Sequence, residues 1–479
     1  MNTSPCEKYQ SGAETPHSRT LSRLRAPQRI PRGPGVRRLC AALVRPTIFL
    51  LTLLALTHRA PAATLLLTNA TIHTVSGPDI EKGQVLITEG KFTKIAKPEE
   101  SLQADETIDL GGNHLYPGFI NPVGSLGLVE IDMIRATRDM AESGQFTPEV
   151  QAWLAVNPDS DLLAAARANG ITHTVAAPSG GIVAGQSGLI QLGGGWTVED
   201  LAAKAPSAMH LFWPSMRLDT TPRDSGRDRE RSKPLEEQAK ERRLRIREIE
   251  DFFSEAEAYA DGNHTETSRV PAWEAMAPVV RGEIPLVVHA DSYSQIKAAL
   301  KFAEGKKLKL IISGGRDSWR LAKELAAQKV PVIFERVYND GNGLSAGDIR
   351  DTEPYDIHFH APTVLAEAGV KVAITGGLGG EEAANVRNIP YVAAQAAAFG
   401  LSRSDAIKAV SLNVAEMYGV SDRLGSIDAG KEATFFEATG DMLDIRSQVK
   451  RVWIKGKQID LANRQSRLYE KYRSRPLPQ

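Results

Sequence analysis

Strand-like and helix-like segments alternate through the middle of this chain, and that alternation limits the fold more than any other feature of the sequence. The helix-like run 164–169 ends at Gly170 and is followed directly by the strand-like run 171–175. Alternation of this kind is typical of βα units around a parallel sheet. About eight such units would close a TIM-like (β/α)8 barrel, so we expect an α/β fold of that class. The later units follow the same pattern, with strands over 284–289, 308–312, 330–334 and 370–374 and helices over 295–304 and 318–328.

Short strands are expected on both sides of this alternating region. Residues 83–88 and 90–96 alternate apolar and polar side chains around a turn, as in a β-hairpin. Residues 451–459 give a similar hairpin pattern, with Gly456 at the turn. The periodicity predicts strands at both ends and leaves open how they pair.

One charge-dense segment, residues 217–262, interrupts the alternation. Its apolar residues have helical spacing, including Leu244, Ile249 and Phe253, but they offer little apolar area. We therefore expect a solvated helical insertion that lies outside the core, over the rim of the barrel. A partner-binding arm is the alternative for a segment with this much charge.

The first 62 residues have the composition of an export signal. A short apolar run over 47–56 follows Arg45, and small residues at 60–63 resemble a cleavage site. The run is too short to cross a bilayer, which takes about 20 residues. We expect a signal peptide over residues 1–62, cleavage after Ala62 or Ala63, and export to the periplasm or beyond. The mature chain would then have no membrane span, whereas an uncleaved N-terminal anchor is the alternative.

The chain beyond residue 62 is mildly acidic and has no cysteine. The whole chain has 58 Lys/Arg and 58 Asp/Glu, and the leader takes ten basic and two acidic residues, which leaves 48 against 56. An acidic body gives no reason to expect nucleic acid as a partner. Both cysteines, Cys6 and Cys40, lie in the leader, so the mature chain would have no disulfide and no thiolate metal site.

Two motifs resemble the amidohydrolase superfamily. Residues 115–128, Leu-Tyr-Pro-Gly-Phe-Ile-Asn-Pro-Val-Gly-Ser-Leu-Gly-Leu, resemble its first barrel strand, Pro-Gly-Phe-Ile-Asp-x-His-x-His-x-Gly. Residues 422–431 resemble its motif Asp-x-x-Gly-Ser-Ile-x-x-Gly-Lys. The resemblance covers residues 64–460 and is closest to imidazolonepropionase-like members. It implies hydrolysis of a non-peptide carbon–nitrogen bond in a small molecule.

The resemblance also implies how the chain divides into domains. Amidohydrolase-like chains bring N- and C-terminal strands together in a small β-sandwich domain beside the barrel. The implied divisions are a β-sandwich from residues 64–115 and 421–460, a barrel over 116–420 that carries the charged insertion, and a C-terminal tail over 461–479.

The positions that carry metal ligands in the family are mostly filled by other residues. Only His289 is kept, and this pattern resembles a degenerate branch of the family. A catalytic zinc needs about three protein ligands, so we expect no metal unless other residues rebuild a site for zinc or another divalent cation. The replacements are Val123 and Ser125 for two histidines, Ser313-Gly314 for a third, and Gly376 or Gly377 for the aspartate that serves as ligand and general base.

The remaining candidates lie near strand ends, where barrels place catalytic side chains. His289 and Asp291, at the end of one strand, are the candidate catalytic pair. His289, and likewise His173 in the strand-like run 171–175, also fits a second interpretation as a buried core histidine that is hydrogen-bonded to its neighbours. The candidate ligand-pocket residues around the pair are Asn121, Ser125, His173 and Ser313.

Other patterns in the sequence carry less weight. Residues 180–187 have the spacing of a phosphate-binding loop, but Gln186 replaces its lysine, which favours a plain glycine-rich loop. His358 and His360 are expected in a loop before a helix over 362–368, away from the first strand. Loops suited to an anion or a sugar-like ligand are expected to gather at one barrel face, from residues 157–161, 179–181, 186–187 and 193–196.

Three functions stay open from the sequence. The first is the carbon–nitrogen hydrolase of the resembled family, with an altered or lost metal centre. The second is a non-catalytic barrel that binds a small ligand, and the third is a metal-free hydrolase built on His289 and Asp291. The expected partner in each case is a small molecule, and assembly into a homo-oligomer also stays open.

Overall fold

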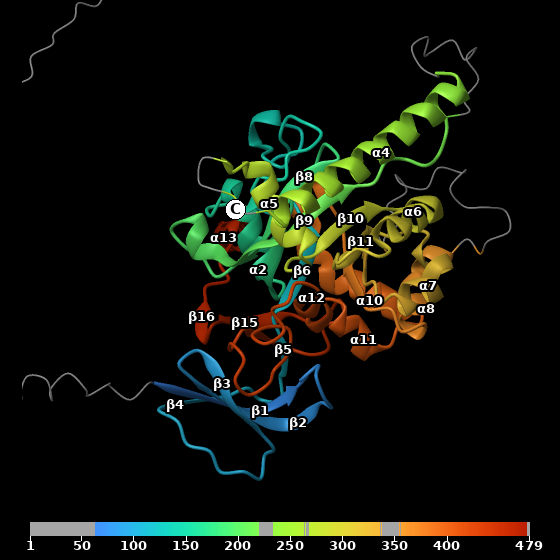
Figure 1. Cartoon of the computed structure of the whole chain (residues 1–479). Coiled ribbons are helices and arrows are strands. Elements are labelled where there is room, and N and C mark those ends of the chain that lie inside the picture. Colours follow the sequence, from blue (N-terminus) through green and yellow to red (C-terminus); the bar gives the residue numbers. More distant parts are fainter. Residues whose placement is uncertain are drawn as a thin grey trace, which may run out of the picture. The chain divides into compact units, whose positions relative to one another are not determined.

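Two eight-stranded sheets organise the chain (Figure 1). The computed structural model describes residues 63–219, 233–262, 264, 268–335, 337, 354 and 356–476. The predicted signal peptide, both cysteines and residues 220–232 of the charged insertion lie outside these described residues. Within the described part, every helix is too short or too polar to cross a membrane.

The first sheet is a nearly closed barrel, which confirms the predicted class. Its strands follow one another in sequence order around the sheet, and neighbours are parallel except around β8. The strands are β6 (Phe119–Gly124), β7 (Ile171–Ala176), β8 (Val183–Gln191), β9 (Ala202–Phe212), β10 (Leu286–Ala290), β11 (Leu310–Gly314), β12 (Val332–Glu335) and β13 (Val372–Thr375).

Strand β8 departs from the regular βα repeat. It pairs antiparallel with both β7 and β9, and within the fully described stretch 171–212 the short α3 (Val198–Leu201) is the one helix. Because β8 runs against its neighbours, its first residues lie where the parallel strands end, and residues 193–196 follow it at the opposite end of the barrel. The sequence alternation did not predict this reversal.

The barrel closes between β6 and β13, which stand at the two ends of the strand order. The carbonyl oxygens of Ala409 and Val410 accept hydrogen bonds from the backbone N–H groups of Ile374, at 3.1 Å, and Ile120, at 2.8 Å. Both acceptors lie between α11 (Arg403–Lys408) and α12 (Leu412–Met417). A segment from late in the chain therefore bridges the first and last barrel strands.

Helices connect most barrel strands and begin where capping residues favour them. The Ser292 side chain accepts from the N–H of Gln295 and the Gln295 side chain accepts in return, a capping box that starts α6. Gly170, at a φ of +83°, follows the end of α2 as predicted. The other helices are α2 (Asp161–Arg167), α4 (Leu235–Ala260), α5 (Pro271–Val280), α6 (Tyr293–Ala303), α7 (Ala322–Ala327), α8 (Ile357–Glu367), α9 (Gly380–Asn385), α10 (Ile389–Ala398) and α13 (Arg464–Arg473).

The second sheet joins strands from both ends of the chain, as the resemblance implied. β14 pairs antiparallel with β5, with Phe436 opposite Tyr116. The rings of Phe435 and Trp453 are buried and stack at a centroid distance of 4.7 Å. Its strands are β1 (Thr64–Ile72), β2 (Ile80–Thr88), β3 (Lys91–Ala96), β4 (Glu106–Asp109), β5 (His114–Pro117), β14 (Phe435–Ala438), β15 (Val449–Ile454) and β16 (Lys457–Ile459).

The charged insertion is only partly outside the core. Its helix α4 carries exposed residues in the first half, such as Leu244. In the second half, Ile249, Phe253 and Ala256 are fully buried. The expectation that the whole segment lies outside the core is therefore wrong, because four well-spaced apolar side chains, these three and Ala260, are enough for one buried helix face.

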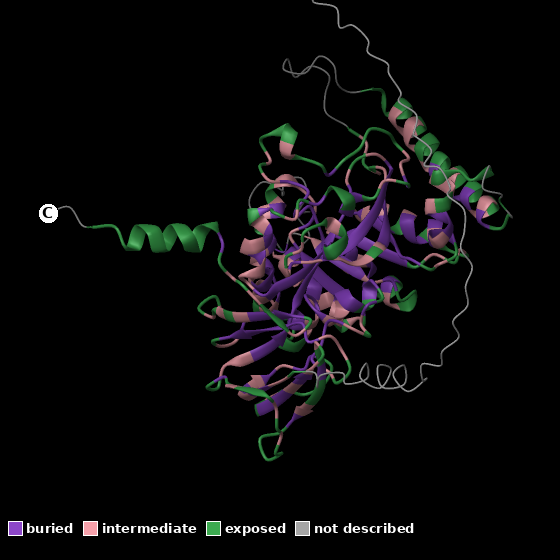
Figure 2. Cartoon of the chain, turned by 90° about the vertical axis from the view of Figure 1, so that its left-hand side faces the viewer, coloured by how far each residue is buried: buried purple, intermediate pink, exposed green. Residues whose placement is uncertain are grey.

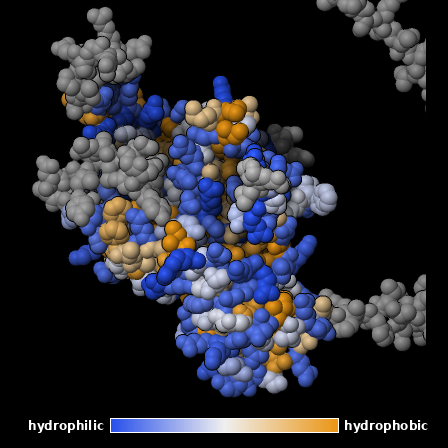
Figure 3. All heavy atoms as spheres, turned by 180° about the vertical axis from the view of Figure 1, so that it is seen from behind, coloured by the Kyte–Doolittle hydropathy of each residue, from blue (hydrophilic) through white to orange (hydrophobic). Residues whose placement is uncertain are grey.

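Burial differs sharply between the barrel and the C-terminal helix (Figure 2). The barrel strands are buried along nearly their whole length, whereas α13 has no buried residue. The face of the molecule seen in Figure 3 is mostly hydrophilic, with small hydrophobic areas between. The apolar core therefore lies within the two sheets and the helix faces that cover them.

Candidate active site

Four consecutive barrel strands place polar side chains near their carboxyl ends. They are His210 on β9, His289 on β10, Ser313 on β11 and Glu335 on β12. Strand pairing puts His289 beside Ser313 and leaves both on one face of the sheet. The carboxyl ends of barrel strands are where enzymes of this architecture carry their chemistry.

These four side chains form one line of polar contacts. His210 Nδ1 lies 3.0 Å from His289 Nε2, a hydrogen bond between the two imidazoles. On its other side, His289 Nδ1 faces Glu335 Oε1 at 3.9 Å. The Ser313 hydroxyl donates to the same carboxylate oxygen at 2.7 Å. We call His210, His289, Glu335 and Ser313 the mouth cluster.

The mouth cluster runs from a dry end to an end that reaches solvent. His210 and Ser313 are fully buried, while the side chain of His289 is 10% exposed and that of Glu335 is 14% exposed. The Phe212 ring stacks on His289 at a centroid distance of 4.1 Å and covers one face of the imidazole. Glu335 is thus the cluster's most accessible charged group.

Burial keeps both imidazoles of the cluster neutral. It lowers the pKa of His289 to about 3 and holds the pKa of His210 well below its usual value, an effect that the neighbouring His289 reinforces. At neutral pH each ring therefore has one N–H donor and one bare nitrogen acceptor. The pair can hold a fixed hydrogen-bond direction, but neither ring is a strong base.

The predicted site residues divide into four groups. His289 and Ser313 belong to the mouth cluster. Asp291 is exposed just after β10, and its Oδ1 lies 2.6 Å from the position that a Cβ on Gly314 would occupy. The contacts of His289 are made with His210, Phe212 and Glu335, so the carboxylate that faces its ring is Glu335.

The buried side chains of Asn121 and Ser125 make hydrogen bonds that link neighbouring strands. Asn121 Oδ1 accepts from the Thr375 hydroxyl at 2.7 Å, and its amide group donates to Thr174 at 2.9 Å. Ser125 donates to the Gly379 carbonyl oxygen at 2.5 Å. These contacts join β6 to β7 and to the end of β13, which indicates that both side chains hold the barrel together.

His173 lies at the other end of the barrel from the mouth cluster. It stands early in β7, opposite Gln191 at the end of β8, and its Nδ1 lies 3.0 Å from the Thr172 hydroxyl. Burial, with smaller effects of Lys455 and Arg423, lowers its pKa to about 3. The structure thus gives His173 the role of a buried core histidine.

The buried histidines predict an acid-sensitive fold. His173 and His289 have a folded pKa of about 3 against a usual value of 6.5, so the unfolded chain binds more protons between these values. Stability is then full above pH 6.5 and falls as the pH drops toward 3, by about 1.4 kcal/mol per pH unit for each group.

We expect His173→Gln to flatten this dependence by about that slope, measured as urea unfolding free energies between pH 4 and 6. The matched control is His360→Gln, because the His360 side chain is 42% exposed. Equal slopes in His173→Gln and the unmodified protein would contradict the assignment.

Two other sequence patterns have different positions from those expected. His358 and His360 lie within α8, not in a loop before it, because the helix starts at Ile357 and includes Pro362 in its first turns. The glycine-rich loops do not gather at one barrel face either. The reversal of β8 separates Gln186 from residues 193–196, and Gly193 lies against Ile454 of the second sheet.

Sequence reasoning missed His210 and Glu335. Each follows an apolar run at the carboxyl end of a strand, Ala208–Met209 for the histidine and Val332–Phe334 for the glutamate. The rule that a barrel's functional residues lie at these ends would have selected both. Neither belongs to the motifs that carried the family resemblance.

Carboxylate side chains lie close to the three glycines that the sequence alignment sets at ligand positions. A Cβ on Gly314 would meet Asp291, one on Gly376 would meet Glu382, and one on Gly377 would meet Glu335. Gly314 and Gly377 also have φ values of +92° and +99°, which side chains rarely adopt. A side chain at any of the three positions would require the neighbouring carboxylate to move.

The mouth cluster does not match a three-ligand metal site either. His210 and Glu335 face opposite nitrogens of His289, so the three donors do not converge on one point. Across the described ranges between residues 63 and 476, no three His, Cys, Asp or Glu side chains meet as metal ligands would. The donors therefore do not fit the metal set that the resemblance implied.

Comparisons with known proteins relate part of the sequence, and the fold, to amidohydrolases. The sequence profile of the Amidohydrolase family matches residues 357–459. The crystal structure of an amidohydrolase from Thermotoga maritima MSB8 is similar with a TM-score of 0.69 and 25% identity, over 83% of this chain and 99% of that chain. Residues 357–459 thus match the Amidohydrolase family, and the described fold is similar to that of a solved amidohydrolase.

Other solved structures resemble this chain at lower identity. An uncharacterized protein is 17% identical over 83% of this chain and 99% of its own, with a TM-score of 0.51, and it shows the fold alone. An adenosine deaminase from Xanthomonas campestris with bound zinc is 15% identical over 86% of this chain and 98% of its own, with a TM-score of 0.47. No curated protein matches the sequence.

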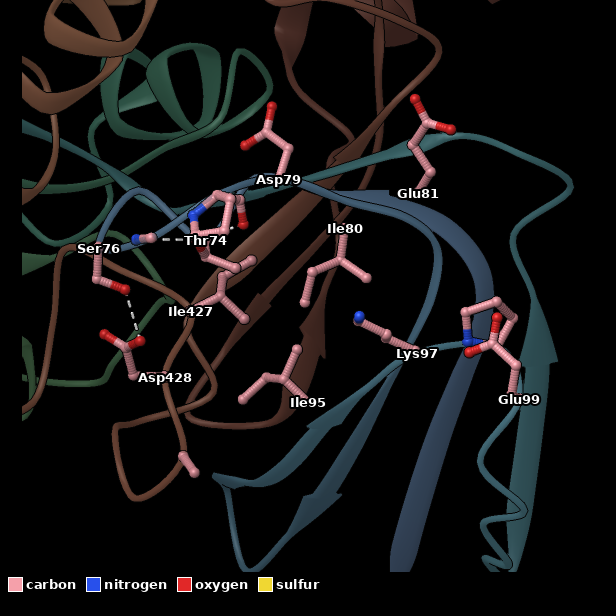
Figure 4. Close-up of a pocket in the computed structure, with 14 residues that line it drawn as sticks. Thr74, Ser76, Asp79, Ile80, Glu81, Ile95, Lys97, Glu99, Ile427 and Asp428 are labelled. Atoms are coloured by element: carbon pink, nitrogen blue, oxygen red, sulfur yellow. Dashed lines mark hydrogen bonds between the residues drawn. The ribbon is translucent and has the colours of Figure 1, made fainter.

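One cavity lies in the second sheet, away from the barrel strands. Its volume is about 570 Å³, and Ile80, Ile95 and Ile427 lie around its centre (Figure 4). The Ser76 hydroxyl donates to Asp428 Oδ1 at 2.6 Å and joins two of its loops. The acidic lining residues are Asp79, Glu81, Glu99 and Asp428, against the single lysine Lys97. We call this cavity the acidic groove.

Proposed function

We propose that this chain hydrolyses a non-peptide carbon–nitrogen bond of a small molecule at the barrel mouth, without the metal centre of its superfamily. The observation that carries the proposal is the position of Glu335. Its carboxylate ends β12, is partly exposed, and is held by the Ser313 hydroxyl beside the His289 ring. The proposed catalytic pair is therefore His289 and Glu335, in place of the pair His289 and Asp291 expected from the sequence.

In this proposal Glu335 is the general base. It accepts a proton from a water molecule as that water attacks the carbon of the scissile bond, and it returns the proton to the leaving nitrogen. The reaction consumes one water, breaks the carbon–nitrogen bond and forms a carbon–oxygen bond. A carboxylate that accepts a hydrogen bond from the Ser313 hydroxyl is restricted in orientation, which favours this role.

His289 and His210 position the base. The hydrogen bond between them is satisfied when His210 Nδ1 donates to His289 Nε2, and His289 then carries its own proton on Nδ1. That proton lies on the side of Glu335, whose Oε1 is 3.9 Å from His289 Nδ1. Both histidines thus act through the carboxylate.

A non-catalytic barrel that binds a small ligand is the second candidate. The observation that favours it is the low pKa that burial gives both imidazoles, since neutral rings suit hydrogen bonding without proton transfer. A panel of small amides, ureas, cyclic imides and amidines, offered to chelator-treated protein, separates the two. Turnover supports the hydrolase, whereas saturable binding without turnover supports the ligand-binding barrel.

We expect the purified chain to hold no stoichiometric zinc. Superfamily members commonly use divalent metals, but here the ligand positions are glycines or other buried residues, and carboxylates lie close to the glycines. Dialysis against a chelator should therefore leave the melting temperature and any turnover unchanged, because no metal-binding free energy is withdrawn. Elemental analysis by mass spectrometry measures the content directly. About one zinc per chain, lost in His289→Ala, would contradict the metal-free mechanism.

We also propose that the protein works after export. The support is the basic leader with its short apolar run and small residues before Thr64. A chain without cysteine after residue 62 needs no thiol chemistry in an oxidising compartment.

A further inference from the structure

A cavity of about 600 Å³ opens at the end of the barrel opposite the mouth cluster. Residues that immediately precede or begin β10, β11, β12 and β13 line it, among them Pro285, Leu310 and Pro331. Its volume is in the range of small-molecule sites, roughly 300–1,000 Å³. We call it the basal cavity.

Lysines stand at the start of successive strands around the basal cavity. Lys309 directly precedes β11, Lys329 comes three residues before β12, and Lys371 directly precedes β13. The carbonyl oxygens of Lys309 and Lys371 each accept a neighbouring strand's backbone N–H at 2.9 Å. These strand-to-strand hydrogen bonds therefore fix the backbone positions of Lys309 and Lys371.

The charges around the basal cavity are not balanced. Four lysines line it against two glutamates. Lys371 pairs with Glu416 at 2.5 Å, while the ammonium of Lys309 contacts a backbone carbonyl oxygen at 3.4 Å. Lys329 makes no ion pair with any residue that the structure describes. Uncompensated positive charge therefore remains on Lys309 and Lys329.

Further cations near the basal cavity strengthen this positive field. The pKa of Lys204 is lowered first by burial and then by the nearby charges of Lys309 and Arg423. The cations at this end of the barrel repel one another, although the chain beyond residue 62 is mildly acidic. An anion bound there would relieve that repulsion.

The floor of the basal cavity is apolar. Leu310, Ile311, Val330 and Met417 line it, and each is less than a tenth exposed. Their side chains belong to the barrel core and offer a firm surface to an apolar group. The lysines lie in the more exposed loops around this floor, so the cavity combines a charged rim with an apolar base.

We propose that the basal cavity binds a small anion that has an apolar part. Lys309 and Lys329 hold its carboxylate or phosphate head, and the apolar part lies on Leu310 and Met417. The acidic groove of the second sheet has the opposite rim charge and excludes such a ligand. The proposal is independent of the hydrolase proposal, because Glu335 ends β12 and the basal cavity lies at the beginning of that strand.

Calorimetric titration of the full chain with octyl phosphate, octanoate, inorganic phosphate and octyl glucoside tests this inference. We expect the two amphiphilic anions to bind, the neutral glucoside not to bind, and inorganic phosphate to bind more weakly than octyl phosphate. The tighter of octyl phosphate and octanoate identifies the preferred head group. All probes are used below their micelle-forming concentrations.

The double variant Lys309→Gln/Lys329→Gln should weaken binding of the amphiphilic anions about tenfold, since two charge-assisted contacts are lost. Lys301→Gln/Lys323→Gln is the matched control, because it removes two exposed lysines of the neighbouring helices that do not line the cavity. The control should bind as the unmodified protein does, and melting temperatures show that both variants fold.

Three results would overturn the proposal. They are the absence of binding of both amphiphilic anions at millimolar concentration, equal binding of octyl glucoside, and equal affinities in the Lys309→Gln/Lys329→Gln variant and the control. Inorganic phosphate that binds as tightly as octyl phosphate would overturn the part assigned to the apolar floor.

Discussion

Glu335→Gln is expected to lower kcat for the chain's best carbon–nitrogen substrate by a factor of about 10²–10⁴, the usual contribution of a general base. The amide keeps the size of the side chain and still accepts from Ser313, so the contact at the end of β12 survives. What disappears is the ability to take a proton from water. Steady-state kinetics on chelator-treated protein measures the effect.

The matched control for this substitution is Glu416→Gln. Glu416 pairs with Lys371 at the opposite end of the barrel, and that exposed pair contributes little to stability. The control should keep kcat within about twofold, a change smaller than 0.5 kcal/mol in the barrier. If Glu335→Gln changes only the KM, or the affinity of a ligand that is never turned over, the ligand-binding barrel is the correct interpretation.

Phe253→Ala is expected to destabilise the protein by about 3–5 kcal/mol, the usual effect of removing a large aromatic ring from a core. Phe253 is fully buried on α4, and its ring meets Phe302 of α6 edge to face at a centroid distance of 5.0 Å. Its loss leaves a cavity between an insertion helix and a barrel helix. Urea unfolding followed by circular dichroism measures the change.

Leu244→Ala on the same helix is the matched control. Leu244 is 50% exposed in the first half of α4, so its truncation should change stability by no more than about 0.5 kcal/mol. Equal effects of the two substitutions would mean that α4 does not dock on the barrel through its second half. The comparison also decides whether the whole charged insertion can be replaced by a flexible linker.

The sequence predicted the architecture well because the barrel depends on patterns that repeat many times. Each βα unit gives its own evidence for the fold class, so the barrel was predicted correctly although the direction of β8 was not. That reversal was missed because β7, β8 and the second half of β9 are buried on both faces, and such burial hides strand direction. The burial of α4 was missed because the composition of the whole segment combines a charged first half with a second half that has an apolar face.

The candidate site was harder to predict because its members lie on four different strands. His289 was found through a family motif, and Ser313 through the position next to a missing ligand. His210 and Glu335 belong to no motif, and only the closure of the barrel brings them within reach of His289. Pairings across a barrel depend on register and strand tilt, which one sequence without its fold does not specify.

The late-chain segments that complete both sheets also affect how this protein is made. The acceptors at Ala409 and Val410 bridge the first and last barrel strands, and β14 adds to β5 only after residue 435. While a ribosome is still extending the chain, neither sheet has its full set of partners, and β5 keeps an open edge. Folding therefore has to wait for nearly complete synthesis. A chain that stays unfolded this long gives holding chaperones time to bind before the sheets close.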